Sequence, residues 1–471
     1  MRDQTLLKYV ALDYKIPCTQ YFSRIRELGH AVLLDSGFTQ CQRGRYDIIS
    51  AAPSARLSFN NEQLMGENLA FNIDDISDPF HAASLLLMMY QELDAKNYVF
   101  AEYPDKEIPF CGGLLGHFSY DLGRCIEEMP QHAEDDTLLP QMHLGLYGWA
   151  IIIDHQQQDC YLMLNTSLPN PDIDDLVKII QTAAPDSCDN FELSSSFSSN
   201  LDKDQYAQAL TKINDYILSG DCYQVNFAQR FSANFQGDPF NAYLKLRSVA
   251  PTHFSAFIDT EHGAILSLSP ERFLSVDKQG HVLTQPIKGT QPRSNNTEQD
   301  QKNKDYLINS EKDRSENVMI VDLMRNDLSK VCELHSVKVP ALFSIESYRN
   351  VHHLVSTVSG KLEQGKSAID LLKGCFPGGS ITGAPKIRAM QIIDELEPHR
   401  RSIYCGSIGY ISLCGAMDTS ITIRTLLAQN NTMHCWAGGG IVADSEIADE
   451  YQETFDKVNN LLDALQTSDR Q

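Results

Sequence analysis

The chain has 471 residues, of which 42% are hydrophobic, and a formal net charge of −23. This length suits two or three domains, or one large α/β unit with a smaller companion. The acidic balance argues against a protein that binds nucleic acid or an anionic membrane non-specifically, because both need a basic surface. It leaves small-molecule substrates open, since an active site can be locally basic.

The cysteines and the N-terminal segment indicate the compartment. The 12 cysteines are scattered singly, without a CxxC pair or a spacing typical of a zinc module. We therefore expect free, mostly buried thiols in a reducing environment. Charged residues interrupt every apolar run of the opening segment MRDQTLLKYVALDYKIPC, which argues against a signal peptide. No apolar run reaches the roughly 18 residues of a membrane span, so we expect a soluble, cytoplasmic protein.

Residues 1–165 contain short apolar runs broken by turns, which predict strands of an antiparallel sheet. These runs are HAVLLDSG (30–37), YDIISAAP (46–53), CGGLLGHFSYDLG (111–123) and LGLYGWAIIIDHQQQDCYLML (144–164). Residues 166–200 are rich in Ser, Asn, Asp and Pro, and this composition predicts a linker.

Residues 201–465 mix helices and strands. Apolar spacing predicts helices over 201–220, 305–331 and 448–465. We predict one strand over 222–235, two strands around a DKQG turn within 263–290, and three strands within 406–445. This mixed order predicts an α+β fold, with large antiparallel sheets packed face to face and helices on their outer faces.

One constrained loop surrounds a lysine. Residues 284–293 read TQPIKGTQPR, in which prolines flank Lys288 and Gly289. Proline excludes a helix and the middle of a central strand, and glycine allows backbone to approach another group closely. Taken alone, the stretch could be a surface turn with a solvated cation.

Residues 360–367 read GKLEQGKS and formally match the phosphate-binding pattern GxxxxGK[ST]. We reject this interpretation, because Glu363 would repel phosphates in such a cradle. A turn followed by a capping box, with Ser367 as N-cap and Asp370 three residues later, is the preferred interpretation.

Two predicted helices each carry a pair of carboxylates on one face. Asp313 and Glu316 are three residues apart, as are Glu450 and Glu453. Four such oxygen ligands suit Mg²⁺, which keeps positions for water and an anionic substrate. Solvated acidic faces are the alternative. The run of glycines 438–440 before the second helix favours an anion site, because bare backbone N–H groups can face an anion there.

Taken together, several motifs of the chain resemble the chorismate-utilising enzymes. This family includes anthranilate, aminodeoxychorismate, isochorismate and salicylate synthases. The resemblance is strong over about 201–465 and looser over 1–165. It rests on SLSPERF (267–273), PIKGT (286–290), EKDRSENVMIVDLMRNDL (311–328), HHLVSTVSG (352–360), FPGGSITGAPKIRAMQIIDELE (376–397), GSIGYISLCGAMDTSITIRTL (406–426) and GGGIVADSEIADEYQETFDK (438–457).

The resemblance implies a Mg²⁺-dependent active site in a cleft between subdomains. Glu316 and Glu453 match the direct Mg²⁺ ligands, and Asp313 and Glu450 match the carboxylates that hold its waters. Glu271 matches the general acid/base that protonates the departing C4 hydroxyl. The remaining matches concern the anionic substrate and its ring: Arg424 and Tyr404 at the pyruvyl carboxylate, Thr382, Gly438, Gly439, Gly440 and Lys457 around the substrate, and His353 beside the ring.

Two positions indicate the branch of the family. Members that add water to chorismate carry a lysine base where this chain has Gln224, which cannot deprotonate water. Anthranilate synthases read PIAGT where this chain and aminodeoxychorismate synthases read PIKGT. In that branch Lys288 would attack C2 as a nucleophile with loss of the C4 hydroxyl, and ammonia would then displace it at C4. The expected product is 4-amino-4-deoxychorismate, a precursor of 4-aminobenzoate and folate.

The expected partners follow from what the chain lacks. It contains no GxCxG nucleophile elbow of a class I glutamine amidotransferase, so we expect a separate glutaminase subunit (component II) to supply ammonia. No nucleic-acid or membrane partner is expected.

The LLDSG segment (33–37) resembles the tryptophan pocket of anthranilate synthase. The matching positions are Ser36, Arg45, Tyr46 and Phe254, with ordinary core packing as the alternative. Anthranilate synthase component I and a non-catalytic tryptophan-binding relative remain alternative identities.

Overall fold

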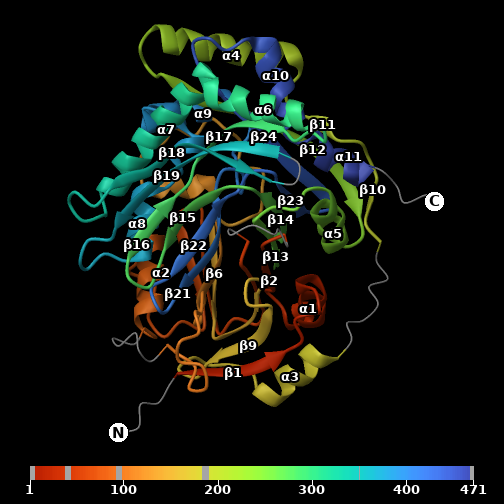
Figure 1. The fold of residues 1–471 in the computed structure, drawn as a ribbon, viewed down its shortest axis with the longest axis vertical. Coiled ribbons are helices and arrows are strands. Elements are labelled where there is room, and N and C mark those ends of the chain that lie inside the picture. The colour runs from red at the N-terminus through yellow and green to blue at the C-terminus, as the bar shows by residue number, and fades with distance from the viewer. Residues whose placement is uncertain (1–5, 38–43, 92–97, 183–189, 349–350, 467–471) are drawn as a thin grey trace.

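The protein is described by a computed structural model that covers residues 6–37, 44–91, 98–182, 190–348 and 351–466. Two large antiparallel sheets, of 13 and 11 strands, form its centre. Helices lie outside them and across one end (Figure 1). The predicted α+β class with large antiparallel sheets is confirmed.

The 13-stranded sheet begins at the edge with β1 and ends with β10. Its strands in spatial order are β1 (Leu7–Leu12), β9 (Asp159–Asn165), β8 (Trp149–Asp154), β3 (Tyr46–Ser50), β2 (Val32–Asp35), β13 (Phe254–Thr260), β14 (Gly263–Ser269), β23 (Thr425–Gln429), β24 (Thr432–Ile441), β12 (Gln224–Gln236) and β10 (Glu192–Leu193), with β11 (Ser198–Ser199) and β20 (Gly383–Ala384) also paired to β12.

The 11-stranded sheet begins at the edge with β17, the strand that contains the PIKGT motif. Its order is β17 (Ile287–Pro292), β19 (Val351–Lys361), β16 (His281–Thr284), β15 (Arg272–Val276), β22 (Met417–Ile421), β21 (Ser407–Ser412), β6 (Gly113–Phe118), β7 (Met142–Tyr147), β4 (Ala55–Asn60) and β5 (Gln63–Glu67), with β18 (Lys338–Ser347) paired to β19.

Apolar side chains of both sheets meet in one core, which includes Ile152 and Ile265 from the larger sheet and Leu144 and Ile408 from the smaller. The opposite face of the larger sheet is covered by α1 (Cys18–Ile25), α3 (Ile173–Gln181), α5 (Pro239–Val249) and α11 (Asn459–Gln466). Alternation along the strands sends side chains to both layers, since successive residues point to opposite faces. The sheets therefore pack face to face as predicted.

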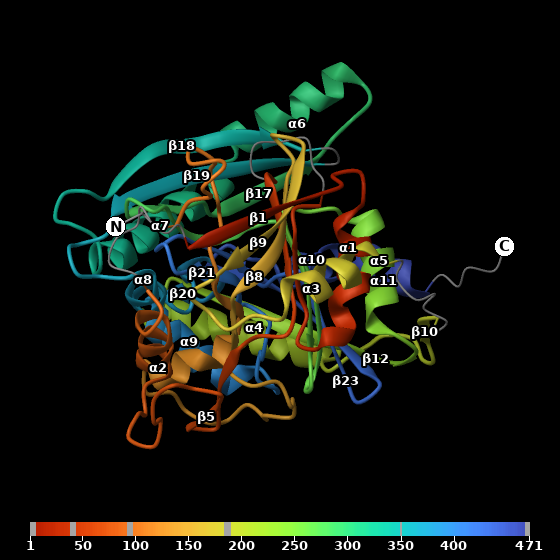
Figure 2. The same ribbon diagram turned by 90° about the horizontal axis from the view of Figure 1, so that it is seen from below.

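The remaining helices place the catalytic motifs. Helices α2 (Pro79–Met88), α7 (Glu311–Ser329) and α8 (Ala368–Cys375) join the inter-sheet core. Helices α4 (Lys203–Leu218) and α9 (Lys386–Leu396) pack on β12 and β24. With α6 (Thr297–Asn309) and α10 (Ile447–Asp456) they lie across one end of the molecule, whereas β1 and β9 lie at the other end (Figures 1 and 2).

Several predicted elements are divided in the structure. The helix predicted over 305–331 is interrupted at Ser310, which ends α6 and caps α7 by accepting the Asp313 N–H at 3.2 Å. The C-terminal helix is likewise two helices, and Lys457 ends the first. The stretches 263–290 and 406–445 contain four strands each rather than two and three. Prolines at positions 270 and 286 separate the strands of the first stretch, because proline cannot donate to a ladder.

The two regions separated by the predicted linker share both sheets. Strands β6 and β7 from the first region lie beside β21 and β22 from the second, and β2 lies beside β13. The predicted linker at 166–200 itself contributes α3, β10 and β11. The composition of this stretch therefore does not mark a gap between independent folding units.

Other local predictions agree with the structure. Ser367 caps α8 in a capping box with Asp370, where GKLEQGKS gave the false phosphate-loop match. The cysteines in the described residues are all free, and of these only Cys125 is exposed. No helix in the described part of the chain combines the length and apolar character that a bilayer crossing requires.

Candidate active site

A cavity of about 580 Å³ lies where the two sheets meet beneath α7 and α10. The wall of this cavity includes residues of β12 and β24 from the larger sheet and of β17 and β19 from the smaller sheet. Nearly all the predicted catalytic, metal and substrate residues line this one cavity. They are Lys288, Glu271, His353, Asp313, Glu316, Glu450, Glu453, Tyr404, Arg424, Gly438, Gly440 and Lys457.

A bulge in edge strand β17 presents Lys288. The pairing of β17 with β19 changes register between Ile287 and Thr290, so Lys288 and Gly289 fall within the irregularity. Gly289 has φ +79°, and a Cβ built there would lie 3.1 Å from Asp313 Cγ. Glycine therefore suits this left-handed conformation, and a side chain here would have to displace Asp313 by a few tenths of an ångström. The prediction that this stretch is neither helix nor central strand is confirmed.

Glu271 lies in the turn between β14 and β15 and is only 6% exposed. Ser380 Oγ donates to Glu271 Oε1 at 3.0 Å. Burial raises the pKa of Glu271 to about 7, although the Lys288 ammonium and the Ser380 hydrogen bond both oppose the shift. A carboxyl group with a pKa near neutrality can both give and take a proton, as general acid–base catalysis requires.

His353 lies on β19, the strand that pairs with β17, and is fixed by its neighbours. It is 3% exposed, and its Nδ1 is 2.8 Å from Thr290 Oγ1. Its ring centroid is 5.5 Å from that of Tyr348. The strand pairing Thr290↔His353 places the histidine within two residues of Lys288 across the ladder.

Arg424 and Tyr404 form the end of the cavity suited to an anion. In the described residues no carboxylate lies within ion-pair distance of Arg424. Burial lowers the pKa of Arg424, while Glu271 opposes that shift. Tyr404 is 3% exposed, and its ring lies parallel to that of Trp436 at a centroid distance of 6.4 Å. A guanidinium without a carboxylate partner is a receptor for a ligand carboxylate.

Four carboxylates from two helices gather at the other end. A Cβ placed on Gly439 would lie 3.1 Å from Glu450 Oε2 and 3.5 Å from Glu453 Oε1, so both side chains converge on this glycine. Burial raises the pKa of Glu316 and of Glu450. Against the effect of burial, the Lys457 ammonium holds the pKa of Glu453 below its usual value.

Two lysines offset part of this negative charge. Lys312 Nζ lies 3.7 Å from Glu450 Oε1, and Lys457 Nζ lies 2.6 Å from Glu453 and donates to the Gly438 carbonyl at 2.8 Å. A set of oxygen donors with an excess of negative charge fits a hard divalent cation such as Mg²⁺.

A tighter cluster of possible ligands lies elsewhere. Within the described residues, only Cys18, Asp35 and Asp47 bring three ligand atoms within 4.8 Å of one another. Both carboxylates are already occupied as acceptors. Arg247 and Tyr243 donate to Asp35 at 3.1 and 2.9 Å, and Ser36 Oγ donates to Asp47 at 2.7 Å, with His155 Nε2 2.8 Å from Asp47 Oδ2. This cluster is a satisfied polar network.

Thr382 and Gly439 are the two predicted substrate residues that are not among the residues lining the cavity. Thr382 is fully buried, and its hydroxyl donates to the Gly378 and Gly379 carbonyls at 3.1 and 3.3 Å. The glycines lie in β24, which pairs with β12 throughout, whereas its pairing with β23 ends at Cys435. The edge of β24 beyond Cys435 therefore borders the cavity.

The predicted tryptophan pocket is only partly assembled. Tyr46 and Phe254 line a separate cavity of about 80 Å³ together with His253 and Asp418. Ser36 instead directs both its N–H and its hydroxyl to Asp47. Arg45 pairs with Asp154 at 2.9 Å and lies 4.5 Å from the Tyr46 ring centroid. Two of the four predicted residues therefore do not line the cavity.

Among the residues of the cavity wall that the sequence interpretation did not name are Asn226, Lys312, Ser380 and Trp436. Ser380 and Lys312 lie inside motifs that carried the family resemblance. Trp436 lies two residues before the glycine run 438–440. Their position within or next to a motif was the sequence signal that could have identified these residues. Only the fold showed which residues of each motif face the cavity.

The arrangement has close counterparts among known proteins. The family model described as chorismate binding enzyme matches residues 31–463. The chain is 48% identical over 447 residues to aminodeoxychorismate synthase component 1 of Escherichia coli (strain K12), covering 95% of each chain. It is 48% identical over 450 residues to the protein of that name from Klebsiella aerogenes, covering 95% of this chain and 96% of that protein.

A solved structure agrees in fold. The crystal structure of anthranilate synthase component I from Streptococcus pneumoniae TIGR4 superimposes with a TM-score of 0.77 at 32% identity, covering 89% of this chain and 92% of that chain. The match of the family model spans nearly the whole described chain. This protein therefore belongs to the family of chorismate binding enzymes.

Proposed function

We propose that the protein converts chorismate and ammonia into 4-amino-4-deoxychorismate, as an aminodeoxychorismate synthase component 1. The observation that carries this proposal is Lys288 in a glycine bulge beside Glu271, within the cavity that also contains Arg424. Likeness to the two bacterial synthases of that name supports the same assignment.

The proposed first step makes a covalent intermediate. The uncharged Lys288 amine forms a bond to C2 of chorismate, both conjugated ring double bonds shift by one position, and the C4 hydroxyl departs. Glu271 gives its proton to that hydroxyl, which leaves as water. A carboxyl group whose pKa lies near 7 because of burial is protonated often enough for this role.

The second step releases the lysine. Ammonia forms a bond to C4, both ring double bonds shift back, and the bond between C2 and Nζ breaks. The proton lost by the attacking ammonia restores the acid–base pair. The sum is chorismate plus ammonia giving 4-amino-4-deoxychorismate plus water. Two substitutions replace one difficult direct substitution at C4, which is the usual advantage of nucleophilic catalysis.

The substrate's two carboxylates suit the two ends of the cavity. Arg424 and Tyr404 would bind the pyruvyl carboxylate, while His353 borders the ring. Glu316 and Glu453 would hold Mg²⁺ directly, with Asp313 and Glu450 holding its waters. The convergence of Glu450 and Glu453 on Gly439 supports this fit. When bound, Mg²⁺ would neutralise the ring carboxylate and fix its position.

The source of ammonia and the location are further parts of the proposal. We place the protein in the cytoplasm as the larger partner of a separate glutamine amidotransferase subunit, component II. The free cysteines of the described residues support a reducing compartment. A tryptophan bound at the cavity beside Tyr46 and Phe254 stays a prediction.

Product identity tests the proposal. The purified protein is incubated with chorismate, Mg²⁺ and ammonium, with and without an added aminodeoxychorismate lyase. We expect 4-aminobenzoate only when the lyase is present. Fluorescent anthranilate formed without lyase would instead assign the anthranilate synthase reaction, which the likeness in fold to the Streptococcus pneumoniae protein makes the second candidate.

Replacing the lysine tests the mechanism. Lys288→Ala should lose most 4-amination, and intact-mass analysis of wild type with chorismate in the absence of ammonia should reveal an adduct that the variant lacks. Lys278→Ala, a lysine in the turn between β15 and β16, is the control. A Lys288→Ala variant with the full rate would exclude the covalent step.

A further inference from the structure

A buried ion pair lies directly behind the cavity wall. Glu397 follows α9 and is 5% exposed, and Arg401 is 1% exposed. Arg401 Nε and Nη2 donate to the two Glu397 oxygens at 2.9 and 2.7 Å, a two-pronged arrangement. Glu397 also accepts the Ala228 N–H of β12 at 2.9 Å. Neither Glu397 nor Arg401 lines the cavity, so neither touches a ligand there.

The remaining donors of Arg401 bind the backbone of two cavity residues. Nη1 donates to the Ile381 carbonyl at 2.9 Å, and Nη2 donates to the Asn226 carbonyl at 2.7 Å. Asn226 in turn donates its N–H to the Thr382 carbonyl at 2.8 Å. One guanidinium thus links β12 to the loop that carries Ser380, Ile381 and Thr382. The planar guanidinium can donate to all of these acceptors at the same time, whereas the compact ammonium of a lysine cannot.

Arg401 also lies between two aromatic rings. Its Cζ is 4.8 Å from the Tyr120 ring centroid and 5.6 Å from that of Tyr404. Tyr404 faces Trp436 in a parallel arrangement at 6.4 Å, and both rings line the cavity. The cation therefore fixes one ring of the wall directly and the next one through stacking.

We propose that Glu397 and Arg401 are positioning residues that hold the cavity wall in its reactive geometry. Through Ile381 they fix Ser380, the donor to Glu271, and through Tyr404 they fix the end that receives a carboxylate. This inference rests on the proposed use of chorismate in this cavity. It explains why a charged pair is kept in a place where apolar residues could fill the volume, since buried pairs by themselves add little stability.

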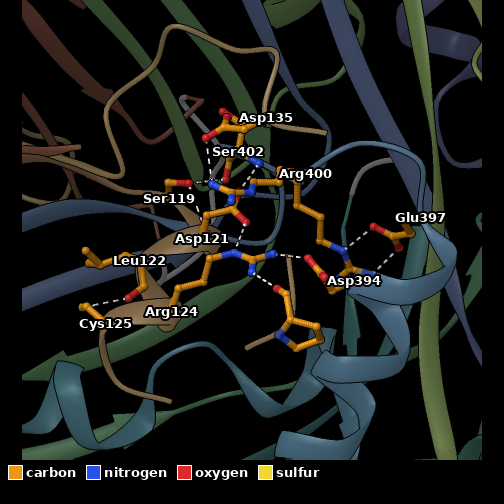
Figure 3. A network of polar contacts seen from close by, with 12 residues as sticks. Ser119, Asp121, Leu122, Arg124, Cys125, Asp135, Asp394, Glu397, Arg400 and Ser402 are labelled. Atoms are coloured by element: carbon orange, nitrogen blue, oxygen red, sulfur yellow. Dashed lines mark hydrogen bonds and ion pairs between the residues drawn. The ribbon is translucent and has the colours of Figure 1, made fainter. Parts of the chain in front are cut away.

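A neighbouring arginine provides a matched control. Arg124 pairs with Asp394 on the same helix α9 and with Asp121 at 3.3 Å, and it donates to the Pro130 carbonyl (Figure 3). Its side chain is 18% exposed, and it does not line the cavity of about 580 Å³. Arg124→Lys therefore disturbs a comparable ion network without an attachment to Ile381, Asn226 or Tyr404.

The test compares Arg401→Lys with Arg124→Lys in the full-length protein. Chorismate consumption is followed with Mg²⁺ and saturating ammonium, so the result does not depend on which amino product forms. We expect kcat to fall about 10- to 100-fold in Arg401→Lys, the cost typical of small misplacements. KM for chorismate should rise by no more than about threefold, because Arg424 remains to bind the carboxylate while the disturbed Ser380–Glu271 geometry acts on the transition state. Arg124→Lys should retain both constants.

Tryptophan fluorescence supplies a second readout that needs no turnover. The chain contains two tryptophans, and Trp149 is completely buried in the core on the far face of the larger sheet. A change in the emission of Arg401→Lys therefore reports Trp436. We expect a shifted or altered emission in Arg401→Lys and the wild-type spectrum in Arg124→Lys. If Arg401→Lys does not yield folded protein, Glu397→Gln replaces it in both measurements, because this substitution preserves the volume of the side chain.

Three results separate the possibilities. Wild-type emission and unchanged kcat in Arg401→Lys or Glu397→Gln would overturn the positioning role. Equal losses in Arg124→Lys would also overturn it, because they would show a general effect of disturbing this network. A wild-type protein that consumes no chorismate would instead overturn the proposed function, and the fluorescence comparison would still decide whether Arg401 fixes the wall.

Discussion

Replacing Gly289 by alanine separates backbone strain from active-site geometry, because the chain provides a matched glycine elsewhere. Gly289 has φ +79° and Gly220 has φ +81°. A Cβ at Gly289 would lie 3.1 Å from Asp313 Cγ and 3.1 Å from Leu307 Cδ2, whereas a Cβ at Gly220 meets nothing within 4 Å. The two substitutions impose the same left-handed conformation on alanine but differ in their surroundings.

The expected magnitudes follow from this difference. An alanine in the left-handed region costs about 1–2 kcal/mol, so both variants should lose about 1 kcal/mol in free energy of unfolding after the smaller entropy of the unfolded chain is included. Only Gly289→Ala must also displace Asp313 or the bulge that carries Lys288. Because a misplacement of about 1 Å lowers a rate by about 100-fold, a shift of a few tenths of an ångström should lower kcat by roughly 3- to 10-fold.

The assays are equilibrium urea unfolding for stability and steady-state chorismate consumption for activity. We expect similar losses of stability in the two variants and this loss of kcat in Gly289→Ala alone. If Gly289→Ala retained the kcat of Gly220→Ala, the bulge would not position Lys288. If Gly220→Ala were as inactive as Gly289→Ala, the comparison would report strain rather than geometry.

Three further predictions concern ionisable groups. Burial raises the pKa of Glu271 to about 7, so the wild type should lose up to about 3 kcal/mol of unfolding free energy as pH rises from 4.5 through 7. Glu271→Gln should be inactive, and its unfolding free energy in urea should fall less over this pH range. If both proteins showed the same pH dependence, the raised pKa could not belong to Glu271. Burial lowers the pKa of His117 to about 4 and of His143 to about 3. The free energy of unfolding should therefore fall by about 2 kcal/mol per histidine as pH falls from 6.5 to 5. His143→Asn should reduce this dependence of stability on pH, and an unchanged dependence would assign the acid sensitivity to other groups. Arg424→Gln should raise KM for chorismate about 10-fold or more, the value of a lost charge-assisted hydrogen bond, and equal KM values would place the substrate carboxylate elsewhere.

Local sequence information predicted many of the residues that line the cavity. The spacing of Asp313 and Glu316, and of Glu450 and Glu453, places each pair on one helical face whatever the rest of the chain does. The prolines around Lys288 exclude a helix, and the structure has an edge strand with a bulge there. Alternating apolar runs predicted individual strands for the same local reason, since side-chain direction has a period of two residues.

Features that depend on pairing between distant segments could not be predicted from local sequence. The break at Ser310 and the extra strand after Pro270 have local signals in a capping serine and a proline, but their pairing partners depend on the rest of the chain. The linker composition of 166–200 did not show that both sheets draw strands from each side of it. Thr382 lies in the expected motif, yet its hydroxyl turns to the carbonyls of its own loop.

What the sequence by itself determined is which residue types this protein has available: a lysine held by prolines and glycine, a carboxyl acid, four paired carboxylates and an arginine. Their chemistry follows from composition and short spacing. Only the tertiary structure decided that they share one cavity, that burial brings the pKa of Glu271 near 7, and that Arg401 secures the wall behind them. Burial and convergence depend on contacts between segments far apart in the chain, such as the Ser380 hydroxyl on Glu271, 109 residues away, and these form only when the two sheets pack together.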